Sequence, residues 1–218
     1  MIQQGFLLIY MLIIPILGIS QNRFIPDLTQ FSEQTLRDSR SGLDSSFMSA
    51  AEQDVVFYMN LVRLEPQTYL QSILLPYVAY YERTNHKYVR SLIRDLKKAK
   101  PVVKIGIKKD LASMAQRHRV DIGEHGIVSH TGSRHHTFTK RTENIRYNYF
   151  GMAENIGFGY QSAFENVIEL LIDLDVPSLG HRKTILNARF NYAGVSMGYH
   201  SDYGTCCVID YASTLPNL

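Results

Sequence analysis

The sequence predicts an α+β fold in which helices pack over a small antiparallel sheet. Apolar side chains recur at helical spacing in the first half of the chain, and Val55, Met59 and Val62 share one face of such a helix. Strand-forming residues gather near the C-terminus, where segments 192–200 and 205–212 flank a short turn-forming stretch. Helices that come first and a hairpin that comes late are typical of the α+β class.

The N-terminus carries an uncharged apolar run over residues 6–19, too short to cross a bilayer comfortably as a helix. Gly18 and Ser20 are small residues at the third and first positions before a cut that precedes Gln21. We therefore expect residues 1–20 to be a signal peptide, with an uncleaved anchor or a buried helix as the alternative. The mature protein would be secreted or periplasmic and would have no transmembrane segment.

The remaining chain predicts one domain. Residues 21–50 are polar, Ser-rich and aperiodic, so we expect a linker or extended arm there and the folded domain over 51–218. The net charge of +3 gives no case for nucleic acid as a partner. The two cysteines, Cys206 and Cys207, are adjacent and would point to opposite faces of a strand, so we expect them not to bridge.

The helices follow in order along the chain. The first is expected to begin after Ser49, and helical pattern continues as far as Pro76. A basic stretch over 83–109 is either an anion-binding patch or, as we favour, a solvated helix face. A strong helical pattern follows from residue 108 to Gly126. The last helix begins after Ser162, which forms a capping box with the residue three positions on.

Three titratable residues stand at element boundaries beside small residues. They are His130 in "SHTG", Glu154 in "AENIG" and His181 in "GHRKTIL". Residues in such positions can converge on the wall of a pocket. We expect Arg182 and Lys183, which follow the second histidine, to face solvent or the rim of the pocket. The other histidines, His118 among them, are assigned no role.

Five features follow one another along the chain: "MNLVRLEP", "SHTG", "ENIGFG", "VPSLGHRKTIL" and the C-terminal hairpin. In this order they resemble the CAP superfamily of cysteine-rich secretory, antigen 5 and pathogenesis-related proteins. The likeness covers roughly residues 51–212 and is greatest to the bacterial, disulfide-poor branch. It implies an α-β-α sandwich with the sheet between helices. It also implies a central cleft lined by two histidines and two acidic residues, three of them being His130, Glu154 and His181.

The fourth member of this tetrad is less well determined by the motif. Asp173, in the element "LID", is our first choice from the resemblance to bacterial members. Glu169 lies one turn earlier on the same helix face, and Asp175 is the other candidate.

Two imidazoles can bind Zn²⁺ or another divalent metal, so His130 and His181 are the predicted metal ligands, although two histidines alone make a weak site. The same four groups could instead form a hydrogen-bonded structural network. No nucleophile in a catalytic setting is evident. The sequence thus favours a binding or interaction module for a lipid, a peptide or an envelope component. The alternatives are a metal-assisted hydrolase of peptides or cell-envelope material and a structural envelope protein.

Overall fold

The computed structural model describes residues 23–214. The predicted signal peptide and its cleavage point lie outside this range and stay predictions. Within it, no helix is long and apolar enough to cross a membrane.

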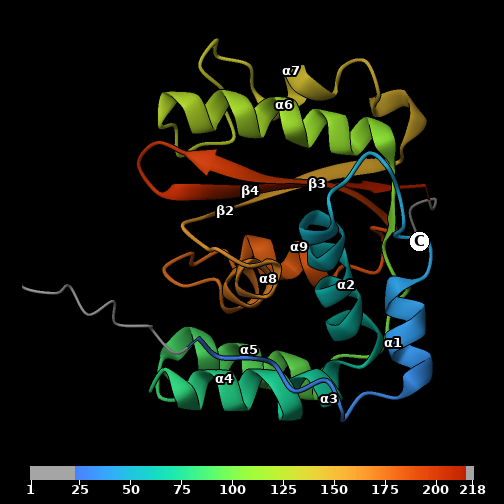
Figure 1. Ribbon diagram of the computed structural model, residues 1–218, viewed down its shortest axis with the longest axis vertical. Helices are drawn as coiled ribbons and strands as arrows, with labels where there is room; N and C mark the ends of the chain where they lie inside the picture. The colour runs from blue at the N-terminus through green and yellow to red at the C-terminus, as the bar shows by residue number, and fades with distance from the viewer. Residues whose placement is uncertain (1–22, 215–218) are drawn as a thin grey trace, which may run out of the picture.

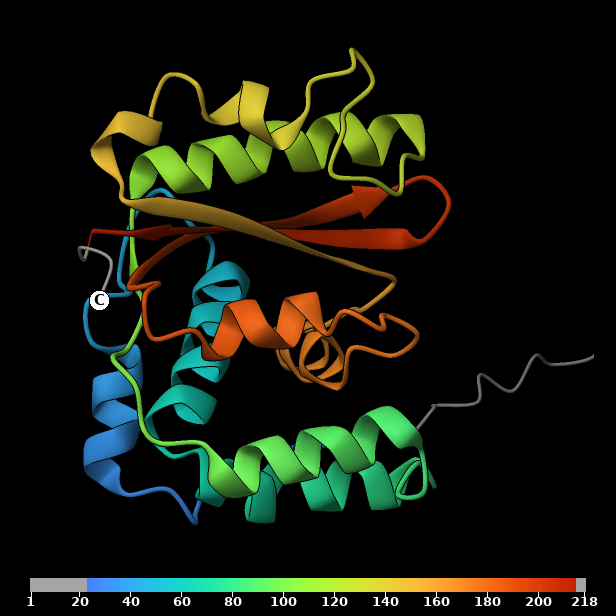
Figure 2. The same cartoon turned by 180° about the vertical axis from the view of Figure 1, so that it is seen from behind.

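Helices cover both faces of one sheet, as Figures 1 and 2 show from opposite sides. One face carries α6 (Lys109–His125) and α7 (Phe138–Thr142), and the other faces α2 (Ala50–Leu64), α8 (Ala163–Ile172) and α9 (Gly180–Leu186). The predicted α+β class, with a sheet sandwiched between helices, is therefore confirmed. The remaining helices lie outside this sandwich: α1 (Glu33–Arg40), α3 (Pro66–Tyr69), the π-helical turn η1 (Leu70–Leu74), α4 (Leu75–Tyr80), α5 (Lys87–Lys98) and the 3₁₀ turn η2 (Arg146–Asn148).

The sheet has the strand order β1–β3–β4–β2. The predicted C-terminal hairpin is formed by β3 (Tyr192–His200) and β4 (Gly204–Ser213), and β2 (Gly151–Phe158) pairs antiparallel with β4 at the edge. The short strand β1 (Gly106–Ile107) runs parallel to β3, so the sheet is mixed where an antiparallel one was expected. Its two residues are too few to show strand periodicity in the sequence.

The main core fills the space between the sheet and α2 and α8, and a smaller apolar cluster lies between the sheet and α6. Cys207 belongs to the first and Cys206 to the second, and both thiols are free. Helix α6 sits directly against β3 at Gly194, where a Cβ would clash with the backbone nitrogen of Ala112. The absence of a side chain at this position lets the helix approach the strand.

The part of the expected linker or extended arm that the structure describes, residues 23–50, is folded in part. It contains α1, which Ser32 caps by accepting a hydrogen bond from the backbone N–H of Thr35, and it buries Phe31, Leu43 and Met48. The few apolar residues are spaced too widely to produce a helical pattern. Their burial comes from joining the main core, which the local sequence does not encode.

Candidate functional site

His181 is held by a carboxylate from the end of the preceding helix. Asp173 adopts a left-handed conformation as the C-cap of α8, and its fully buried side chain turns toward the start of α9. Its Oδ1 accepts a hydrogen bond from His181 Nδ1 at 2.7 Å, and its Oδ2 accepts one from the backbone N–H of Arg182 at 3.0 Å. Asp173 thus orients the imidazole and supplies a cap for α9, since Leu179 at the N-cap makes no side-chain hydrogen bond.

The other two acidic candidates lie elsewhere. Glu169 is buried on α8 and accepts hydrogen bonds from Arg83 and from the hydroxyl of Tyr77. Asp175 is exposed in the turn between α8 and α9. Of the three predicted candidates, Asp173 is therefore the one that contacts His181.

Two buried arginines fix the helix that carries His181. Arg182, expected at the surface, is 1% exposed and donates to the carbonyls of Leu171, Ile172 and Tyr88 and to Asp95. The expectation was wrong because carbonyls at the end of α8 and a carboxylate on α5 can receive the whole guanidinium. Lys183 is exposed, as expected.

The second arginine, Arg63, reaches α9 from the end of α2. Its Nη1 donates to the carbonyls of Ile185 at 2.6 Å and of Asn187 at 2.9 Å. These groups lie at the C-terminal end of α9, where the helix dipole favours a positive charge. The position of His181 is therefore set from both ends of its helix.

The first histidine forms a similar pair with the edge strand β2. His130 Nδ1 donates to Oε1 of Glu154 at 2.8 Å, and Nη2 of Arg141 on α7 donates to the same oxygen at 2.8 Å. The imidazole of His130 is 54% exposed, whereas the Glu154 side chain is 2% exposed. Burial alone would raise the pKa of Glu154, but the hydrogen bonds from His130 and Arg141 outweigh it and hold the pKa below its usual value.

Neighbouring residues of β2 connect the two pairs. Glu154 points toward α6 and α7, and Asn155 points to the opposite face, as alternation along a strand requires. The Nδ2 of Asn155 donates to the backbone carbonyl of His181 at 3.2 Å and to the hydroxyl of Tyr211 at 3.2 Å. The four predicted residues thus form two histidine–carboxylate pairs, and the amide of Asn155 links β2, which carries Glu154, to the backbone of His181.

Three residues that were assigned no role also belong to the Glu154 side of the site. His118 is buried on α6 with its Nε2 3.9 Å from Glu154 Oε1, and burial lowers its pKa. Arg141 contacts Glu154 directly, and Asp210 on β4 is its register partner. A charged residue within the apolar run "CCVIDYA" was the one sequence signal available for Asp210.

The side chains present offer a metal ion few ligands. Each carboxylate engages an imidazole Nδ1, so the pairs leave Nε2 of His130 and of His181, and within residues 23–214 no three His, Cys, Asp or Glu side chains are grouped to hold a metal. Catalytic zinc sites use three protein ligands. A divalent metal at these histidines therefore stays a prediction.

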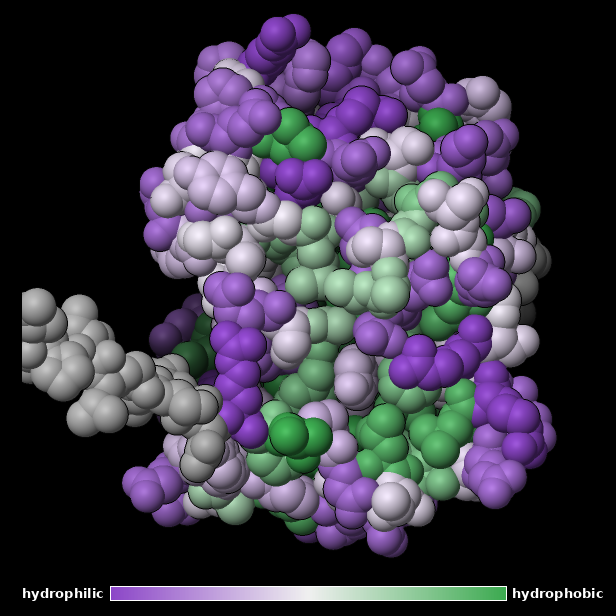
Figure 3. Space-filling view, in the orientation of Figure 1, coloured by the Kyte–Doolittle hydropathy of each residue, from purple (hydrophilic) through white to green (hydrophobic). Residues whose placement is uncertain are grey.

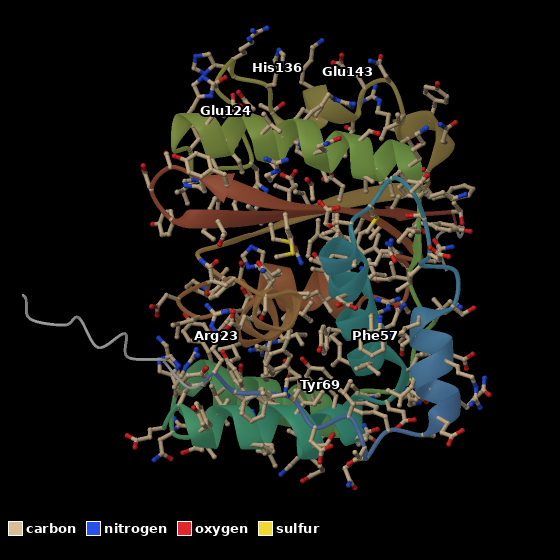
Figure 4. The ribbon with its side chains drawn as sticks, in the orientation of Figure 1. Arg23, Phe57, Tyr69, Glu124, His136 and Glu143 are labelled. Atoms are coloured by element: carbon tan, nitrogen blue, oxygen red, sulfur yellow. The ribbon has the colours of Figure 1, made fainter. Side chains whose placement is uncertain are left out.

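A cavity of about 810 Å³ lies between α6, the loop after it and α7. Glu124, His136 and Glu143 line it and are labelled in Figure 4. The surface over these elements is predominantly hydrophilic in Figure 3. Its lining includes Arg141 and His118, so this cavity adjoins the buried side of the His130–Glu154 pair.

Comparison with protein families assigns most of the chain to one family. The family model described as the cysteine-rich secretory protein family, CAP, matches residues 59–211. No curated protein matches the chain.

Three solved bacterial structures are similar to this chain. An outer surface protein of Borrelia burgdorferi is 18% identical over 51% of this chain and 79% of its own, with a TM-score of 0.43. An extracellular protein containing a SCP domain from Bacillus anthracis is 18% identical over 58% of this chain, with a TM-score of 0.41. A cysteine-rich secretory protein from Staphylococcus aureus is 19% identical over 63% of this chain, with a TM-score of 0.36. The match spans 39% and 38% of the length of the last two proteins. Since the family model covers well over half of the sequence, the chain belongs to the CAP family of cysteine-rich secretory proteins.

Proposed function

We propose that this protein is an exported CAP-family binding module whose ligand contacts the imidazoles of His130 and His181, each of which is held by a carboxylate. The proposal of export rests on the uncharged apolar run over residues 6–19. A lipid, a peptide or an envelope component are the ligand classes we expect. Hydrolysis by a metal-activated water stays a separate prediction.

One observation carries the binding proposal: both imidazoles use the same ring nitrogen, Nδ1, to contact a carboxylate. In each pair a carboxylate accepts from Nδ1, at 2.8 Å for His130 and 2.7 Å for His181. A carboxylate acceptor fixes the proton on Nδ1 and leaves Nε2 of the neutral ring as a hydrogen-bond acceptor or a metal ligand. The exposed fraction of each imidazole, 54% and 23%, leaves both rings open to a ligand.

Nitrogen NMR of the histidine side chains at pH 7.5 tests this arrangement. We expect both rings to show the tautomer with the proton on Nδ1, and added Zn²⁺, used as a probe for free imidazole nitrogens, to shift the Nε2 resonances of both. Asp173→Asn should release the tautomer of His181 and leave that of His130 unchanged, and Asp175→Asn is the matched control. Proton placement on Nε2 in both rings of the unmodified protein would contradict the proposal.

A second candidate function, docking at an anionic membrane surface, is favoured by α5. Five cations fall within about 100° of arc on this helix, and all are exposed: Lys87, Arg90, Arg94, Lys97 and Lys98. Within residues 23–214 none of them forms an ion pair with a carboxylate. The opposite face of the helix is buried through Val89, Leu92 and Leu96, so the cationic side faces away from the core. Each such cation near an anionic bilayer contributes about 1 kcal/mol.

Cosedimentation with vesicles tests the docking function. Binding to vesicles that contain phosphatidylglycerol, but not to pure phosphatidylcholine vesicles, is expected, and it should weaken as salt is raised. A triple variant with glutamine at Arg90, Arg94 and Lys97 should lose vesicle binding. The control triple variant has glutamine at Lys109, Arg134 and Lys140, which lie on α6, the loop after it and α7, and it should still bind. Equal binding by both triple variants would contradict a role for α5.

A further inference from the structure

The strands β2 and β4 bring two carboxyl groups face to face in the interior. Glu154 and Asp210 are direct register partners, so their Cβ atoms are about 4.5–5.5 Å apart and their side chains leave the same face of the sheet. The Asp210 side chain is fully buried and that of Glu154 is 2% exposed. Like charges directly opposite one another on a buried face would destabilise the pairing of the two strands.

The hydrogen-bond partners of the two groups are incomplete if both are ionised. Oε1 of Glu154 accepts from His130 and Arg141, but its Oε2 has no donor. Both carboxyl oxygens of Asp210 also lack a donor, and all three atoms are sealed from solvent. A buried acceptor without a donor is costly, and a buried carboxylate more so. A single proton on Asp210 supplies the missing donor for Oε2 of Glu154 and removes one of the two buried negative charges.

We propose that Glu154 and Asp210 form a buried acid–carboxylate pair that shares one proton, carried by Asp210 and donated to Oε2 of Glu154. Asp210 is then a positioning residue. Asp210 fixes Oε2 of Glu154, and Oε1 of the same carboxylate holds His130. The inference deepens the site proposed above, but it concerns the protein without any ligand.

The groups around the pair favour this placement of the proton. Arg141 and His130 donate to Glu154, so the negative charge is stabilised there. Besides Arg141, the cation that acts on Asp210 is Arg117 on α6. The residue opposite Asp210 on β3 is Gly194, which has no side chain to offer a donor. Burial, then the charge of Glu154, raises the pKa of Asp210 well above its usual value. His118 on α6 is neutral at physiological pH, since burial lowers its pKa.

The pair has a distinct effect on the pH dependence of stability. A carboxyl whose pKa is higher in the folded protein contributes stability that is fully present below the unfolded pKa, near 4, and is lost as pH rises through the folded pKa. Asp210→Asn keeps a donor for Glu154 but has no proton to lose. The unfolding constant of the unmodified protein, relative to that of the variant, should therefore rise with pH above the unfolded pKa, by about tenfold per pH unit until the folded pKa of Asp210 is reached.

Urea unfolding of both proteins over this pH range, without added ligand, measures that ratio. Asp44→Asn, at an exposed aspartate, is the matched control and should show a constant ratio. A constant ratio for Asp210→Asn as well would overturn the proposal, since it means that folding does not take up a proton at Asp210.

Infrared spectroscopy of the folded proteins gives a second measurement that does not depend on unfolding. The unmodified protein at pH 7 should show the C=O stretching band of a protonated carboxylic acid, and Asp210→Asn should remove it while Asp44→Asn retains it. Absence of the band from the unmodified protein would also overturn the proposal. Both results are independent of ligand binding, so a failure of the acid pair and a failure of the binding module are distinguishable.

Discussion

Arg63 offers the most direct test of how the site is held in place, because it is a buried cation without a carboxylate partner among the described residues. Its side chain is 1% exposed, and its three nitrogens donate to four backbone carbonyls, those of Val103, Ile185, Asn187 and Phe190. Burial lowers its pKa to about 10, which leaves it charged at neutral pH. Replacement by methionine keeps much of the apolar volume and removes all five donors.

The cost of Arg63→Met follows from the acceptors that it leaves behind. The carbonyl of Asn187 also accepts from the backbone N–H of Phe190, so three carbonyls lose their donor. Each costs about 1 kcal/mol at the low end, or about 3 kcal/mol together. Part of this is offset because the variant no longer desolvates a charge. We therefore expect a loss of about 1–3 kcal/mol, against a total stability of about 5–15 kcal/mol for a domain.

Urea denaturation followed by circular dichroism measures this loss. Arg37→Met on α1 is the matched control, since Arg37 is 63% exposed and its ion pair with Glu33 should contribute less than about 0.5 kcal/mol. Arg63→Lys separates charge from geometry, because it keeps the charge but has three donors on one nitrogen. If Arg63→Met unfolds at the same urea concentration as Arg37→Met, with equal m-values, the carbonyl cluster does not stabilise the fold as we infer.

Three further predictions concern packing, metal and processing. Gly194→Ala should destabilise the protein by about 1–3 kcal/mol, the range for overpacking, because the added Cβ meets the backbone of Ala112. Thermal unfolding measures this loss. Gly151→Ala is the control and should show no comparable loss, since its added atom meets nothing within 4 Å. If zinc binds, the melting temperature should be higher with zinc than with a chelator, and His181→Ala should remove that increase. If zinc leaves the unmodified protein unchanged and His181→Ala is destabilised, the hydrogen-bonded network is favoured instead. Intact mass of exported protein should place the mature N-terminus at or near Gln21, and retention of the initiator methionine would rule out cleavage.

Much of the site could be predicted from local sequence because its residues stand where elements begin and end. Gly180 and Pro177 mark the turn before His181, whereas Asp173 was the first of three candidates only through the resemblance to bacterial CAP members; the structure pairs it with that histidine. Helix capping, apolar periodicity and turn-forming residues act over a few positions, so they can be recognised in the sequence without knowledge of the fold. The helices α2, α6 and α8 and the C-terminal hairpin were predicted in this way.

The tertiary structure alone decided which charges are buried and what they face. Arg182 follows a histidine in a polar stretch and gives no local sign of burial, yet carbonyls from distant helix ends enclose it. Asp210 and Glu154 lie far apart in the chain, and only the register of β2 against β4 sets them opposite one another. Register depends on the packing of the whole sheet rather than on any short segment. The sequence by itself therefore indicated α2, α6, α8, the C-terminal hairpin and the two histidines, whereas α1, β1 and the partners that hold Glu154 depended on long-range packing and pairing.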